Sequence, residues 1–285
     1  MRRKTFFLMS VILVLMGNGL LRANGLPVVD APADMPEDTG KVILYKAFSH
    51  NDYWRPNPLF DALSLRFNCV EADLWLVDGE LMVAHDRTEI QQARTFQNLY
   101  LKPLIERVRA NGGKVFPTSD RPFLLMVDCK TNGEAMYPVL KKVMEPYKDY
   151  FCKVEDGKLI EGAILFFLSG DRPLESLPNE SNRFIFLDGR IKDLDQCIPA
   201  TVMPVISDNY PNFFSWRGEG EMPADELHKL RNLLMKTHTE GKLLRWWGAP
   251  DTKQFKRFFL QEGLDLIGTD DLQLLYDVMT SDAEK

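Results

Sequence analysis

The sequence lacks the features that mark several large classes of protein. Its four cysteines form no CxxC pair, which argues against a zinc ribbon or a thioredoxin-like redox motif. It has 35 Lys and Arg against 41 Asp and Glu, a formal net charge of -6, so we expect no nucleic-acid binding by phosphate neutralisation. No Pro/Gly/Ser-rich linker or internal repeat divides the middle of its 285 residues. The remaining composition, 45% hydrophobic and 27% charged, is typical of one globular domain.

Residues 1–25 have the layout of a secretory signal peptide. Basic residues at positions 2–4 precede an apolar run over residues 5–21, which a Gly-Asn-Gly interrupts and which falls short of the roughly 20 residues that span a bilayer. We therefore predict cleavage and export, periplasmic or secreted, over an uncleaved anchor. Residues 26–40 are rich in proline and acid and predict a mature N-terminal tail. Residues 41–285 then form the folded domain, with no second hydrophobic span.

Short apolar runs alternate with helical patterns through this domain. Strands are predicted at residues 42–48, 69–76, 123–129, 163–168, 184–187, 202–206, 243–247 and 264–268. Helices are predicted at residues 58–67, 96–110, 135–147, 224–239 and 252–262. Eight strands with crossover helices at this length predict an α/β fold, a (β/α)8 TIM barrel in a single domain. An open doubly wound sheet is the alternative, weakened because no GxGxxG follows the first strand.

Ionisable residues gather where the predicted strands end, which is where parallel barrels place their active sites. His50 follows the first strand. On the second strand Glu71 and Asp73 share one face by the two-residue period, in an otherwise apolar run. Buried carboxylates need a partner, which is either a bound cation or a Lys or Arg inside the barrel. These two acids alone do not decide between the alternatives.

The next segments bring more polar groups to the same end. Asp78-Gly79 is a hairpin-turn signal, and the returning strand delivers His85 close to the acidic pair. The third barrel strand ends with Asp128 and Lys130 on one face. A single histidine at a strand end is more often structural, but two histidines, three acids and a lysine at one rim favour a functional site.

The four cysteines are expected to form at most one disulfide. Cys69 shares the face of Glu71 and points into the barrel, whereas Cys129 points towards the helix layer. A bridge between these two is therefore disfavoured.

Together these motifs resemble the PI-PLC-like phosphodiesterase superfamily, most closely its glycerophosphodiester phosphodiesterase and sphingomyelinase D-like branches. The resemblance covers residues 49–131 and rests on His50, Glu71-x-Asp73, the Asp-Gly turn, His85-Asp86 and Asp128-x-Lys130. It implies a TIM barrel and a phosphoric diester hydrolase that uses a His/His pair and a metal. It also implies that His50 acts as base or nucleophile and that His85 protonates the leaving alkoxide.

The chain departs from the glycerophosphodiesterase pattern after the first histidine. That branch usually has His-Arg-Gly, with the arginine helping to hold phosphate, and here Asn51-Asp52 follows His50. Asn51, Arg55 and Arg245 are therefore predicted to bind substrate, together with Trp247, an aromatic residue at the seventh strand that suits the superfamily.

The chemistry of the site is coherent from its residue types. Glu71, Asp73 and Asp128 offer hard oxygen ligands, which predict one divalent cation, Mg²⁺ or Ca²⁺. Lys130 would bind a phosphate oxygen, and histidine is the side chain type suited to acid-base catalysis near neutral pH. We expect a small-molecule or lipid phosphodiester as substrate, with at most transient contact to a membrane surface. The alternatives are a non-catalytic barrel that binds a phosphorylated or carbohydrate ligand, and a glycoside hydrolase.

Overall fold

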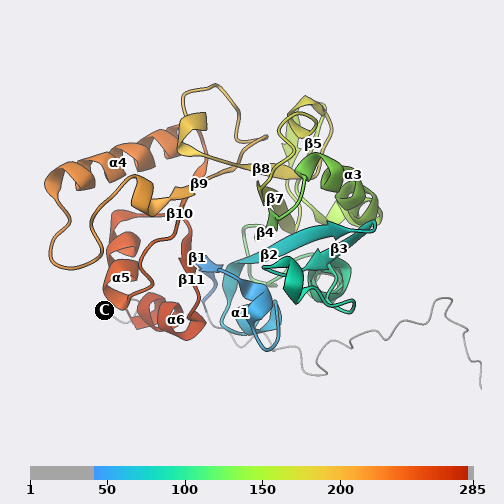
Figure 1. The fold of residues 1–285 in the computed structure, drawn as a ribbon, viewed down its shortest axis with the longest axis horizontal. Helices are drawn as coiled ribbons and strands as arrows, with labels where there is room; N and C mark the ends of the chain where they lie inside the picture. The colour runs from blue at the N-terminus through green and yellow to red at the C-terminus, as the bar shows by residue number, and fades with distance from the viewer. Residues whose placement is uncertain (1–41, 282–285) are drawn as a thin grey trace, which may run out of the picture. The chain divides into compact units, whose positions relative to one another are not determined.

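Eight parallel strands form a nearly closed ring in the computed structural model, which describes residues 42–281. The strands are β1 (Leu44–Ser49), β2 (Phe67–Val77), β4 (Phe123–Cys129), β7 (Ile164–Gly170), β8 (Phe186–Gly189), β9 (Val205–Asn209), β10 (Leu243–Trp247) and β11 (Ile267–Thr269). Their order in the sheet is β10-β9-β8-β7-β4-β2-β1-β11. An isolated parallel bridge between Arg245 and Leu266 joins the two ends. Figure 1 shows the blue β1 beside the red β11 with which it pairs.

Helices cover the outside of this ring (Figure 1). They are α1 (Phe60–Ser64), α2 (Lys102–Ala110), α3 (Gly133–Met144), α4 (Ala224–Thr239), α5 (Lys253–Glu262) and α6 (Leu272–Ser281). The alternation of parallel strands and helices confirms the predicted TIM barrel and rules out the open sheet. All described residues belong to one compact unit. The predicted signal peptide and acidic tail lie outside the described residues.

Alternate strand residues divide between two apolar clusters. The inner cluster includes Phe48, Cys69 and Met126, on the strand face that also carries Glu71. The outer cluster contains Cys129 and the apolar faces of the helices. All four cysteines are free thiols, and the opposite positions of Cys69 and Cys129 confirm that a bridge between them is disfavoured.

The predicted hairpin after β2 is present. β3 (Glu80–Val83) pairs antiparallel with β2, and Asp78 and Gly79 form the turn with positive φ angles of 50° and 84°. The backbone N–H of Ala84 donates to the carbonyl of Asp73, which brings the following residue, His85, beside that acid. Within residues 42–281 no helix is both long and apolar enough to cross a bilayer.

Candidate active site

One pocket of about 350 Å³ at the carboxyl ends of the strands gathers most of the predicted site residues. It is also lined by Ser169 at the end of β7 and by Arg190 after β8, which the sequence analysis did not single out. The predicted residues in its wall are His50, Asn51, Glu71, Asp73, His85, Asp128, Lys130, Arg245 and Trp247.

Asp270, which directly follows β11, forms a hydrogen bond with His50. The Nδ1 atom of His50 lies 2.8 Å from Oδ1 of Asp270, and its Nε2 atom lies 3.7 Å from Oε2 of Glu71. Burial lowers the pKa of His50, but the hydrogen bond to Asp270 and the charge of Glu71 outweigh it, so this pKa lies above its ordinary value. Because Asp270 engages Nδ1, Nε2 is the nitrogen left for a substrate.

Three side chains position His85. Its Nδ1 atom lies 3.0 Å from Oδ2 of Asp73 and 3.1 Å from the hydroxyl oxygen of Tyr53. The same hydroxyl lies 2.6 Å from Oδ2 of Asp73, and the ring of Trp54 packs on the imidazole with the centroids 5.1 Å apart. Burial and the charge of Asp73 raise the pKa of Tyr53, so Tyr53 stays a neutral hydrogen-bond donor.

Lys130 lies between two of the three carboxylates. Its Nζ atom is 2.9 Å from Oδ2 of Asp73 and 2.7 Å from Oδ2 of Asp128. Burial alone would lower the pKa of Lys130, but the two acids raise it above its ordinary value, so the side chain is an ammonium. In this arrangement the cation that Asp73 and Asp128 share is the lysine.

The third carboxylate, that of Glu71, has different neighbours. Its Oε2 accepts the backbone N–H of Asn51 at 3.2 Å and lies 3.8 Å from Nη2 of Arg245. Asn51 adopts a left-handed conformation with φ 48°, which asparagine tolerates better than most residues. The guanidinium of Arg245 packs over the ring of Phe48, 4.1 Å from its centroid. Burial raises the pKa of Glu71, although the charges of Arg245 and His50 oppose the rise.

The fit of these carboxylates to a metal ion is incomplete. Their oxygens are the ligands that Mg²⁺ and Ca²⁺ prefer, and Oδ1 of Asp73 is buried without a hydrogen-bond partner. However, no three His, Cys, Asp or Glu side chains of the described chain converge as a metal-binding group. A divalent ion held by Glu71, Asp73 and Asp128 therefore requires the ammonium of Lys130 to move away from both aspartates.

Two predicted substrate-binding residues have contrasting positions. Trp247 lines the pocket and is 41% exposed, whereas its neighbour Trp246 packs into the aromatic core against Phe213 and Phe214. Arg55 does not line this pocket. Its guanidinium donates to the carbonyls of His50, Thr269 and Asp270. These contacts brace the β1–β11 edge.

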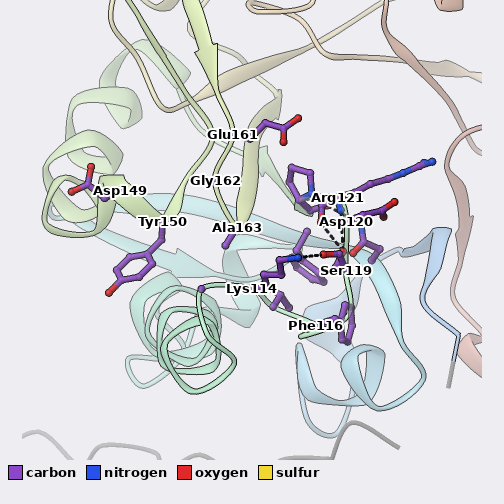
Figure 2. Close-up of a pocket in the computed structure, with 15 residues that line it drawn as sticks. Lys114, Phe116, Ser119, Asp120, Arg121, Asp149, Tyr150, Glu161, Gly162 and Ala163 are labelled. Atoms are coloured by element: carbon purple, nitrogen blue, oxygen red, sulfur yellow. Dashed lines mark hydrogen bonds between the residues drawn. The ribbon is translucent and has the colours of Figure 1, made fainter. Parts of the chain in front are cut away.

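A second pocket, of about 470 Å³, opens at the amino ends of β4 and β7 (Figure 2). Lys114, Asp120, Arg121 and Glu161 line it, and Lys114 donates to the carbonyl of Ser119. It contains no histidine, and the amino end of a parallel barrel is the end associated with stability. The pocket at the carboxyl ends, which contains the histidines, is therefore the better candidate for an active site.

The comparison with protein families agrees with this placement. The family model described as "AIM6-like phosphodiesterase domain" matches residues 37–188, more than half of the chain. The chain belongs to this AIM6-like phosphodiesterase family. The match confirms the predicted relation to the PI-PLC-like phosphodiesterases. Of the residues that line the pocket, those from His50 to Gly170 fall inside the matched span, and Arg190, Arg245 and Trp247 follow it.

Two relatives of this chain are moderately similar to it. The "Altered inheritance of mitochondria protein 6 homolog" of Arthroderma benhamiae is 26% identical over 284 residues, covering 90% of this chain and 89% of that protein. "Altered inheritance of mitochondria protein 6" of Lachancea thermotolerans is 28% identical over 278 residues, covering 81% of this chain but 65% of that protein. Among solved structures, a glycerophosphodiester phosphodiesterase from Parabacteroides distasonis is 13% identical with a TM-score of 0.46, covering 84% of this chain and 98% of its own.

Three residues that line the pocket or contact its histidines were not among the predicted site residues. Tyr53 carried a signal, since it lies three residues after His50 in the same strand-end segment. Asp270 follows the last strand, and its partner His50 lies 220 positions away in the sequence, so no local pattern joins the two. Arg190 follows a strand of only four residues, with no motif around it.

Proposed function

We propose that this chain is an exported, metal-dependent phosphoric diester hydrolase that acts on a phospholipid head group or on its deacylated glycerophosphodiester. The observation that carries the proposal is that one pocket holds both histidines, all three carboxylates and the lysine. Membership of the AIM6-like phosphodiesterase family supports the same class of reaction. The export part of the proposal rests on the pattern of residues 1–25.

The two histidines are proposed as the acid-base pair. Asp270 engages Nδ1 of His50 and Asp73 engages Nδ1 of His85, so each ring keeps Nε2 for the substrate. Following the superfamily, we assign His50 the role of general base or of nucleophile. We assign His85 the role of general acid that protonates the leaving alkoxide. The base can act on a water molecule or on a hydroxyl of the substrate itself.

Cationic groups would hold the phosphate. Glu71, Asp73 and Asp128 are the proposed ligands of one Mg²⁺ or Ca²⁺, which when bound supplies Lewis-acid stabilisation of a phosphate oxygen. Lys130, once it leaves the two aspartates, can donate to a second oxygen. Arg245 is held near the pocket floor by Glu71 and the Phe48 ring and adds positive potential there.

Two substrates that differ in their leaving group test these assignments. Bis(p-nitrophenyl) phosphate has a leaving group that needs little protonation, whereas glycerophosphocholine must release an alkoxide. His50→Ala should lower kcat/KM about 10²–10⁴-fold on both substrates, because its role precedes departure of the leaving group. His85→Ala should lose as much on glycerophosphocholine and much less on the aryl diester. EDTA should abolish both activities, and added Mg²⁺ or Ca²⁺ should restore them.

The matched control is His228→Ala, on the outer helix α4, where Nε2 of His228 lies 2.9 Å from Nδ2 of Asn232 and outside the pocket. It should retain full activity. Retention of most diesterase activity in His50→Ala would overturn the mechanism. Binding of both diesters without turnover would favour the non-catalytic alternative.

A further inference from the structure

An arginine outside the motifs lines the same pocket. Arg190 follows β8 and shares the pocket wall with His50, His85 and Lys130. Its side chain is 20% exposed, so it is neither a surface residue nor part of the closed core.

Two buried side chains hold Arg190 by one edge of its guanidinium. Nη1 donates to Oδ2 of Asp188 at 2.8 Å and to the carbonyl of Gly189 at 2.9 Å, and Nη2 lies 3.3 Å from Oγ of Ser169. The Ser169 hydroxyl in turn donates to Oδ2 of Asp188 at 2.7 Å. Asp188 and Ser169 are 0% and 4% exposed and lie at the ends of the neighbouring strands β8 and β7. The guanidinium is therefore fixed in orientation before any ligand arrives.

The other edge of this guanidinium has no hydrogen-bond partner in the described chain. Arginine has five N–H groups, and the bonds to Asp188, Gly189 and Ser169 use both of those on Nη1 and one on Nη2. The N–H of Nε and the second N–H of Nη2 remain, and they point in the same direction. Two parallel N–H groups of this kind match the two oxygens of a carboxylate or a phosphate.

The position of Arg190 separates it from the groups assigned to the scissile phosphate. His50 follows β1 and Glu71 and Asp73 lie on β2, while Arg190 follows β8, three strands further along the order β2-β4-β7-β8. Arg245, three strands from β2 in the other direction, lies 3.8 Å from Glu71. In the described chain Arg190 instead bonds Asp188, Gly189 and Ser169, none of which is a proposed metal ligand or catalytic histidine. Its guanidinium is therefore held apart from the groups assigned to the scissile phosphate and is available to a second group of the substrate.

We propose that Arg190 binds a second anionic group of the substrate, a carboxylate or phosphate on the arm attached to the scissile phosphodiester. This inference rests on the proposed function and names its substrate class, a phosphodiester with an anionic head group. Asp188 and Ser169 act as positioning residues for Arg190.

The test compares three glycerophosphodiesters: glycerophosphoserine with a carboxylate, glycerophosphoinositol 4-phosphate with a phosphate, and glycerophosphocholine with a cation. The wild type should have a kcat/KM at least tenfold higher for one of the two anionic substrates than for the choline diester. Whichever anionic substrate it prefers identifies the anion that Arg190 binds. Arg190→Gln should raise KM for that substrate at least tenfold and remove the preference. Arg190→Lys should have an intermediate effect, because it keeps the charge but loses the paired N–H groups.

The matched control is Lys192→Gln, which removes one positive charge two residues away from an exposed position outside the pocket. It should leave the preference intact. An equal loss on all three substrates in Arg190→Lys and Arg190→Gln would overturn the proposal, since it would assign Arg190 to the scissile phosphate or to folding. A preference unchanged in Arg190→Gln would overturn it as well.

A calorimetric titration separates this inference from the proposed function. If the wild type hydrolyses none of the three diesters, the glycerophosphodiester part of the proposed function fails, and the dissociation constants of the same compounds then test Arg190 alone. Tighter binding of an anionic diester that is lost in Arg190→Gln would support the inference. Equal binding of all three to both proteins would contradict it.

Discussion

Replacing Lys130 by methionine should leave two carboxylates without their shared cation. Asp73 is 1% exposed, and its Oδ2 lies 2.9 Å from the Lys130 ammonium, which also contacts Asp128 at 2.7 Å. Breaking a buried ion pair by removing one partner costs about 3–5 kcal/mol. Because the lysine side chain is itself 22% exposed, we expect the lower end, about 3 kcal/mol, in the free energy of unfolding at neutral pH.

Urea unfolding in EDTA measures this loss, with Lys141→Met as the matched control. Lys141 pairs with Glu180 at 2.8 Å, but the two side chains are 35% and 28% exposed. Surface pairs of this kind contribute about 0–1 kcal/mol. A Lys130→Met protein as stable as the Lys141→Met protein would refute the reasoning.

The loss should also depend on pH. Burial raises the pKa of Asp73, and the charge of Lys130 limits the rise, so the variant should have a still higher pKa at this carboxyl. A carboxyl whose folded pKa exceeds its unfolded value contributes stability at low pH that is lost as the pH rises through the folded pKa. The destabilisation by Lys130→Met should therefore be smaller near pH 5 than near pH 8.

Divalent cations should reverse the loss if the proposed metal site is correct. A ligand that binds only the folded state at a hundredfold excess over its dissociation constant stabilises by about 2.7 kcal/mol. Lys130→Met should thus gain more stability from Mg²⁺ or Ca²⁺ than the wild type does, because the lysine no longer competes for Asp73 and Asp128. No gain in the variant would contradict the metal site while leaving the ion-pair argument intact.

Three further predictions concern other parts of the chain. Asp270→Asn should lower kcat/KM about 10–100-fold and shift the pH–rate profile to lower pH, because the hydrogen bond to Asp270 raises the pKa of His50; an unshifted profile would contradict this pairing. Burial raises the pKa of Asp52 to about 6, so the free energy of unfolding should fall as the pH rises through that value. Asp52→Asn should remove this pH dependence and be up to about 3 kcal/mol more stable than the wild type at pH 8. Urea unfolding at several pH values measures both effects. Alkylation followed by mass spectrometry should modify Cys197 alone in the native protein and all four cysteines in urea; a pair protected in urea until reduction would reveal a disulfide.

Local patterns were sufficient for the strands that build the site. The two-residue period over β2 placed Glu71 and Asp73 on the inner face, and the Asp78-Gly79 turn placed His85 beside them, because both signals act over a few residues. The same kind of signal was overlooked at Asp156-Gly157. That turn joins β5 (Lys153–Glu155) to β6 (Lys158–Ile160), whose three-residue strands are too short to show a hydrophobic period.

Contacts that depend on closure of the barrel were not predictable from local pattern. Asp270 reaches His50 only because β11 pairs with β1 across 220 positions of sequence. The sequence pattern also did not predict the direction in which a side chain points after a strand ends. Arg55 turns back onto the carbonyls of the β1–β11 edge, whereas Arg190 turns into the pocket. The sequence left two partners open for the buried acids, a metal ion or a basic side chain. The structure shows Lys130 paired with Asp73 and Asp128, and the metal ion is a proposal.

The most direct test of the central claim is the rate of glycerophosphodiester hydrolysis by the purified protein, with and without EDTA, for the wild type and His50→Ala. We predict turnover by the wild type that EDTA abolishes and Mg²⁺ or Ca²⁺ restores, and a rate about 10²–10⁴-fold lower in the variant. Equal rates in the wild type and His50→Ala would contradict the assignment of this pocket as the active site.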